Sequence, residues 1–224
     1  MVVVLGMHRS GTTAFVGTLQ AAGLYLGNVR RRDPETREVP AINRLHEAIL
    51  ERSGGSWRAP PTSVEWTDQH RDLRDRIGRS FDRAQLWGFK DPRTVLLLDF
   101  WREAFGDSLV PVGIFREPRA VVASLLNRDG AEEDEWFGVW KHYNAALLRE
   151  HESSPFPLVE FAADGDRFHE QLVLVLRRLG LRVSAKPGFF DPRRAGGHPT
   201  TVGQPPPDVG DIYTQLRARA VGSI

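Results

Sequence analysis

Short apolar runs alternate along this chain with longer stretches in which apolar residues recur at helical spacing. The runs, rich in valine, isoleucine, leucine and phenylalanine, occupy residues 2–5, 86–89, 110–115 and 158–161. Runs of this length are typical of strands buried on both faces of a sheet. The helical pattern recurs over residues 13–22, 118–126, 132–151 and 167–179, and from Pro40 to Leu50. This alternation predicts βαβ units and an α/β fold with a central parallel sheet.

Length and composition predict one domain, residues 1–224, large enough to bury a sizeable core. A charged helix is expected from Thr67 or Asp68 to Arg83, and another helix from Arg93 to about Phe105. Residues 186–211 are rich in proline and glycine, so we expect a flap or an ordered loop there.

The first strand leads into the sequence Gly6-Met7-His8-Arg9-Ser10-Gly11-Thr12-Thr13, which opens the first helix. A strand, a glycine-bounded loop and a helix together form a cradle for phosphate, because loop N–H groups and the helix dipole converge on one anion. The spacing matches the Walker loop of nucleotide-binding proteins, except that Thr12 occupies the lysine position. This departure argues against an ordinary NTPase.

Charged turns follow three of the predicted strands. The first strand leads to Arg9, the second to Lys90 and Arg93, and the third to Arg116. Ligands of open parallel sheets bind outside the carboxyl ends of the strands, where these turns meet. Four cations on one rim predict a small polyanionic ligand.

Residues 6–13, together with Arg116-Glu117-Pro118-Arg119-Ala120 and Ser124, resemble the two phosphosulfate-binding motifs of PAPS-dependent sulfotransferases. PAPS is 3′-phosphoadenosine 5′-phosphosulfate, and PAP is its desulfated product. The turn at residues 90–93 is similar to that of bacterial and tyrosylprotein-type members. The resemblance is dense over residues 1–130. It implies a three-layer sandwich of P-loop NTPase-like topology and metal-independent sulfuryl transfer to an acceptor hydroxyl.

The resemblance also implies roles for individual residues. Ser10, Gly11, Thr12 and Thr13 would hold the 5′-phosphate, Arg9 would neutralise the leaving oxygen, and Arg116 with Ser124 would bind the 3′-phosphate. His8 belongs to the same loop and is expected to be structural or to add a backbone contact. Arg193 or Arg194 would close over the 3′-phosphate, as late basic loops do in this family.

Two carboxylates compete for the role of general base. Glu38 precedes the helix at Pro40, where related bacterial and tyrosylprotein-type enzymes carry a catalytic glutamate. Asp91 follows Lys90, the second-strand lysine that we also assign to catalysis, and stands where cytosolic members have a histidine. Neighbouring cations lower the pKa of an aspartate and weaken it as a base. His46 is expected on a helix surface.

The remaining features limit the class of partner. A net charge of +1 gives no case for nucleic acid or membrane binding, and the absence of cysteine excludes disulfides and thiolate chemistry. No apolar run approaches the roughly 18 residues of a membrane span, and none resembles a signal peptide, so we expect a cytoplasmic protein.

The expected partner is a small molecule, secondary metabolite or glycan, and the run Arg30-Arg31-Arg32 hints at an acidic one. The acceptor pocket is a possible place for Trp57 and Trp66, whereas the spacing of Trp136 and Trp140 favours the core. Two alternatives stay open: a nucleotide kinase or NTPase with an altered loop, which would need Mg²⁺ and ATP, and a non-catalytic nucleotide-binding module.

Overall fold

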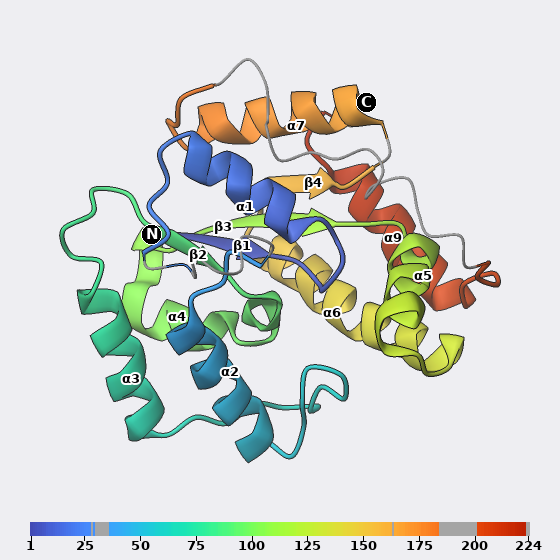
Figure 1. Cartoon of the computed structure of the whole chain (residues 1–224), viewed down its shortest axis with the longest axis horizontal. Helices are drawn as coiled ribbons and strands as arrows, with labels where there is room; N and C mark the ends of the chain where they lie inside the picture. Colours follow the sequence, from blue (N-terminus) through green and yellow to red (C-terminus); the bar gives the residue numbers. More distant parts are fainter. Residues whose placement is uncertain (28, 30–35, 163, 184–200, 223–224) are drawn as a thin grey trace.

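Within the part of the chain that the computed structural model describes, residues 1–27, 29, 36–162, 164–183 and 201–222, four parallel strands form the central sheet (Figure 1). The strands are β1 (Val2–Leu5), β2 (Gly88–Lys90), β3 (Val110–Phe115) and β4 (Leu158–Glu160), in the order β2-β1-β3-β4. In the parallel register, Val3 of β1 pairs with Phe89 of β2 and with Pro111 of β3. Their carboxyl ends therefore meet at one edge.

Helices cover both faces of this sheet. Val2 and Val4 point to the face that packs against α1 (Thr12–Ala21) and α7 (Gly165–Arg178), whereas Val3 and Leu5 point to the opposite face. The second face is covered by α4 (Leu98–Phe105) and α6 (Glu133–Ser153), as Figure 1 shows. Alternate side chains of a strand face opposite sides, so a strand buried on both faces must be apolar throughout.

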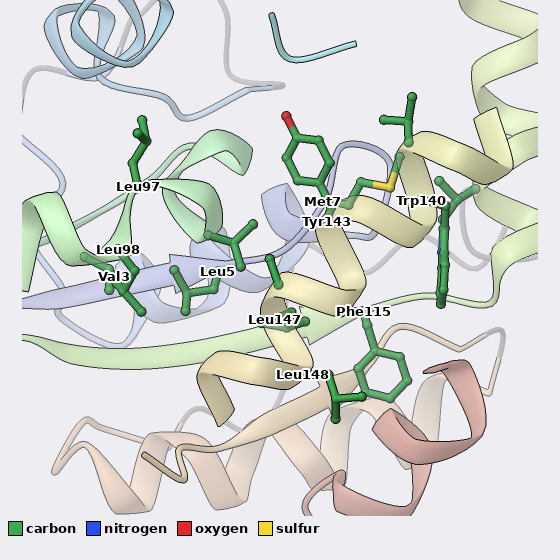
Figure 2. Close-up of a cluster of buried hydrophobic side chains, with 14 of the residues drawn as sticks. Val3, Leu5, Met7, Leu97, Leu98, Phe115, Trp140, Tyr143, Leu147 and Leu148 are labelled. Carbon is green, nitrogen blue, oxygen red and sulfur yellow. The ribbon is translucent and has the colours of Figure 1, made fainter. Parts of the chain in front are cut away.

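The other helices lie around these layers. They are α2 (Pro40–Arg52), α3 (Asp68–Arg79), α5 (Pro118–Asp129) and α9 (Pro207–Arg219), with short 3₁₀ turns η1 (Pro92–Leu96) and η2 (Gly106–Ser108). Helix α6 packs against both α5 and α9, and α2 packs against α3. Figure 2 shows how Tyr143 and Leu147 of α6 meet Leu5 and Met7, which lie on and just after β1. Trp136 and Trp140 are fully buried, as their spacing predicts.

The predicted strands and helices are confirmed, with errors at four places. The helix expected from Arg93 to Phe105 is instead the 3₁₀ turn η1 followed by α4, which begins at Leu98. Strand β2 begins at Gly88 instead of residue 86, because Leu86 and Trp87 pair with Tyr25 before the sheet begins. The charged helix ends at Arg79, four residues before Arg83. The predicted loop 186–211 is wrong at its end, because Pro207 begins α9. Proline is favoured at a first helical position, since its missing N–H would have no partner there.

Candidate active site

A cavity of about 390 Å³ opens at the carboxyl ends of β1, β2 and β3. It is lined by His8, Arg9, Gly11, Thr12, Thr13, Ala14, Thr36, Glu38, Lys90, Pro92, Arg116, Arg128 and Phe161. A larger hollow of about 850 Å³ lies at the opposite sheet edge, beside Tyr25 and Arg182, away from the charged turns. The smaller cavity is the candidate site because it unites three of the four cations expected on this rim.

The loop between β1 and α1 forms one wall of the cavity. Gly6 lies so close to β3 that an added Cβ would sit 2.4 Å from the carbonyl oxygen of Ile114. Gly11 has a φ of 82° and would place a Cβ 2.3 Å from the Phe161 ring. The loop turns back sharply there, and α1 begins at Thr12. The first N–H groups of a helix have no partner within that helix, so this end of α1 offers donors to an anion.

Arg9 adopts the left-handed conformation, with a φ of 65°. For a residue with a side chain, this conformation costs about 1–2 kcal/mol. Two contacts hold the loop in this conformation: Arg9 Nε donates to Ser124 Oγ at 2.7 Å, and Arg116 Nη1 donates to the Arg9 carbonyl oxygen at 3.1 Å. Strained residues of this kind persist where the surrounding structure fixes them. The two predicted phosphate motifs, far apart in sequence, are therefore joined directly.

Arg116 lies at the end of β3 and is almost fully buried. Its guanidinium lies 5.4 Å from the centre of the Phe161 ring. Burial lowers the pKa of Arg116 to about 10, and the nearby positive charge of Arg9 acts in the same direction. The side chain is still charged at neutral pH. A bound anion would offset both the burial and the repulsion between the two arginines.

On the β2 side, Glu38 is held by two donors. Lys90 Nζ lies 2.5 Å from Glu38 Oε1, and Asn43 Nδ2 donates to Glu38 Oε2 at 2.6 Å. Only 3 % of the Lys90 side chain and 14 % of the Glu38 side chain are exposed. Both residues line the cavity. A carboxylate fixed beside a cation at the cavity wall has the geometry of a general base next to a charge-stabilising group.

Asp91 is fully buried and is not among the residues that line the cavity. Its carboxylate accepts from the backbone N and from Nη1 of Arg93, and lies 3.4 Å from His46 Nδ1. Burial alone would raise the pKa of Asp91, but His46 and Arg93 hold it below its ordinary value. His46 Nε2 in turn accepts from Trp101 Nε1 at 2.8 Å. Asp91 orients its neighbours and has no access to an acceptor in the cavity.

Two expectations about side-chain placement on this side are wrong. His46 lies on a helix as predicted but is fully buried, where Nε2 accepts from Trp101 and Nδ1 lies 3.4 Å from the Asp91 carboxylate. Arg93 turns inward to Asp91 and to Glu47 instead of joining the rim cations.

His8 and Arg128, which both line the cavity, contact the ring of Trp57. The His8 ring packs on Trp57 with 4.5 Å between centroids, and Arg128 lies 5.4 Å from the centre of the Trp57 ring. Burial lowers the pKa of His8 to about 3, and the charge of Arg93 contributes, so the imidazole is neutral at pH 7. Sequence reasoning missed Arg128. The available signal was its position four residues after Ser124, on the same face of one helix.

The other predicted binding residues differ in whether they reach the cavity. Thr12 and Thr13 line the cavity, whereas Ser10 is fully buried and Ser124 touches the site through Arg9. Arg193 and Arg194 lie outside the described residues. Across the described ranges, no three His, Asp or Glu residues gather as a possible metal site, and no helix is long and apolar enough to cross a membrane.

Comparison with family models and with curated proteins finds no match. Among solved structures, the chain is similar to the sulfotransferase domain of the olefin synthase from Synechococcus PCC 7002, with a TM-score of 0.61 and 15 % sequence identity. The match covers 96 % of this chain and 94 % of that domain. The fold is that of sulfotransferase domains. It is a P-loop NTPase-like fold, as the first loop and the parallel sheet predict.

A weaker likeness links the chain to sulfotransferase STF1 from Mycobacterium tuberculosis H37Rv. The TM-score is 0.45 at 16 % identity, and the match covers 96 % of this chain and 75 % of that one. This likeness is too weak to add to the argument, and neither comparison identifies a substrate.

Proposed function

We propose that this protein is a sulfotransferase that moves a sulfuryl group from PAPS to a hydroxyl of a small molecule, secondary metabolite or glycan. The proposal rests on one observation: Arg9 and Arg116 contact each other and line the same cavity, at a glycine-bounded loop that lacks the Walker lysine. Two arginines and a helix N-terminus suit a ligand with two separated phosphate groups better than a triphosphate held through a metal.

The residues of the cavity fit the cosubstrate at both phosphates. The N–H groups that begin α1, with the hydroxyls of Thr12 and Thr13, are suited to the 5′-phosphate. Arg116 is suited to the 3′-phosphate, and Phe161 beside it offers an apolar surface. Ser124 keeps Arg9 directed toward the other arginine through its 2.7 Å hydrogen bond.

In the proposed reaction, PAPS supplies the sulfuryl group, and the bond between sulfur and the 5′-phosphate oxygen breaks as the bond to the acceptor oxygen forms. Glu38 accepts the proton of the acceptor hydroxyl. Arg9 and Lys90 stabilise the negative charge that the 5′-phosphate oxygen gains. As in phosphoryl transfer, most of the rate enhancement comes from positioning and charge stabilisation.

The first experiment is thermal unfolding with PAP, ADP, and ATP with and without Mg²⁺. A ligand at about 100 times its Kd stabilises the folded state by about 2.7 kcal/mol, which shifts the midpoint visibly in a domain of this size. We expect PAP to stabilise far more than ADP, and a chelator to have no effect. Stabilisation by Mg-ATP with no response to PAP would favour a kinase, and no response to any nucleotide would refute nucleotide binding.

Two variants locate the effect. Arg116→Met should abolish the excess stabilisation by PAP over ADP, whereas Arg149→Met, on the exposed face of α6, should leave it unchanged. Glu38→Gln should keep the PAP response but lower transfer from PAPS about 100-fold or more, the usual contribution of a general base. Equal turnover of Glu38→Gln and wild type would remove Glu38 from the mechanism.

A further inference from the structure

Arg128 lines the cavity but has no part in the chemistry proposed above. It lies in the last turn of α5, one helical turn beyond Ser124, and its guanidinium lies over the Trp57 ring. Asp129 accepts from Nε and Nη2 of Arg128. Among the described residues Nη1 has no hydrogen-bond partner, so one edge of the guanidinium still has donors to offer.

The position of Arg128 differs from that of the cosubstrate-binding arginine. Arg116 packs on Phe161, which follows β4, and it donates to the loop at Arg9. Arg128 packs on Trp57, whose ring contacts His8 and stacks on Trp136 of α6. The two arginines therefore belong to different walls of one cavity, one beside β4 and one beside the His8–Trp57–Trp136 stack.

Cations outnumber carboxylates among the residues that line the cavity. Four cations line the cavity, Arg9, Lys90, Arg116 and Arg128, against a single carboxylate, that of Glu38. That carboxylate is already paired with Lys90 at 2.5 Å. Asp129 pairs with Arg128 along the edge formed by Nε and Nη2, and His8, which packs on Trp57, is a neutral imidazole, so the donors left to a bound anion are those on the Nη1 side of Arg128.

An arginine that lies over an indole ring has less freedom to lose when it binds an oxyanion. A carboxylate or phosphate can then accept two parallel hydrogen bonds from a guanidinium, which gives direction as well as affinity.

We propose that Arg128, supported by Trp57, binds an oxyanion of the acceptor, so that the preferred acceptors are hydroxylated acids. The inference rests on the sulfotransferase function proposed above. It assigns a specificity-determining residue and narrows the acceptor to a molecule with a hydroxyl near Glu38 and a carboxylate or phosphate on Arg128.

The test uses matched probes on protein saturated with PAP. Each set contains a carboxylic acid, its primary amide and the corresponding phosphonate, on one aromatic and one aliphatic alcohol skeleton. Binding is followed by ligand-observed NMR and by competition, and transfer is followed by release of PAP from PAPS. We expect the acids or phosphonates to bind at least tenfold more tightly than the amides. Whichever of these two classes binds more tightly indicates whether the natural acceptor carries a carboxylate or a phosphate.

Three variants separate this role from a structural one. Arg128→Gln should remove the preference for the anion and leave the stabilisation by PAP intact, and Arg128→Lys should keep part of the preference. Lys141→Gln, an exposed cation on α6, serves as the control and should change neither. An anion preference that survives Arg128→Gln overturns the proposal, as does equal or absent binding of acids and amides.

The outcomes also distinguish this inference from the function on which it rests. If wild type does not respond to PAP, the sulfotransferase proposal fails first. If wild type responds to PAP but Arg128→Gln does not, then Arg128 belongs to the cosubstrate site and the acceptor assignment is wrong.

Discussion

The pair formed by Lys90 and Glu38 should couple strongly in a double-mutant cycle. Both side chains are largely buried, at 3 % and 14 % exposure, and their charged atoms lie 2.5 Å apart. Breaking a buried pair leaves a charge without compensation and typically costs about 3–5 kcal/mol. Lys90→Met keeps the apolar stem, and Glu38→Gln keeps an acceptor for Asn43, so each variant mainly removes charge.

The double variant should therefore lose less than the sum of the single variants. For residues in direct contact the coupling is about 0.5–3 kcal/mol, and burial places this pair in the upper part of that range. The assay is chemical denaturation of the wild type and the three variants at neutral pH. The coupling should change little between low and high salt, because buried charges are screened weakly.

Lys141 and Asp208 provide a matched control within the same protein. Their charged atoms also lie 2.5 Å apart, but about half of each side chain is exposed. Water and salt should reduce their coupling to the limit of detection. A Lys90–Glu38 coupling no larger than that of the control, or one that disappears in high salt, would refute the view that burial makes this pair strong.

Three further outcomes follow from the site. Gly11→Ala should destabilise the folded state by about 2–5 kcal/mol in chemical denaturation, because the left-handed backbone and the contact with Phe161 both oppose a Cβ. The control is Gly54→Ala, which has a φ of 74° and open space around it and should show only the cost of the left-handed backbone. Equal losses of stability in the two variants would exclude a contribution from the Phe161 contact. Asp91→Asn should cost about 3 kcal/mol at pH 7 because Arg93 loses its buried partner. The lowered pKa of Asp91 means that its contribution is complete above about pH 4 and is lost as the pH falls through the folded-state value, so wild type and variant should converge in acid when denatured over a pH series. NMR should show that the His8 imidazole stays neutral down to about pH 4. Because the pKa of His8 in the folded state, about 3, lies below its value in the unfolded state, wild type should lose stability between pH 6.5 and 3 by an amount that His8→Gln does not show. Titration of His8 near pH 6.5 would contradict the view that burial lowers its pKa.

The sequence determined the features that depend on local pattern and on sheet topology. The four strands, the glycine-bounded loop and the placement of Arg9, Lys90 and Arg116 at one edge follow from apolar runs and from the rule that parallel strands end together. Trp136 and Trp140 were placed in the core by their helical spacing alone. These signals lie within a few residues of one another, so no knowledge of distant contacts is needed.

The tertiary structure decided where the charged and polar side chains point. Arg93 turns inward because Asp91 is buried beside it, and His46 is buried because Trp101, 55 residues away, donates to it. Ser124 meets Arg9 across 115 residues, and Arg128 lies over Trp57, which belongs to a loop distant in the sequence. Periodicity fixes which face of an element is apolar, but the partner of a charge depends on which other elements pack next to it. That information is set by the whole fold, and no local pattern carries it.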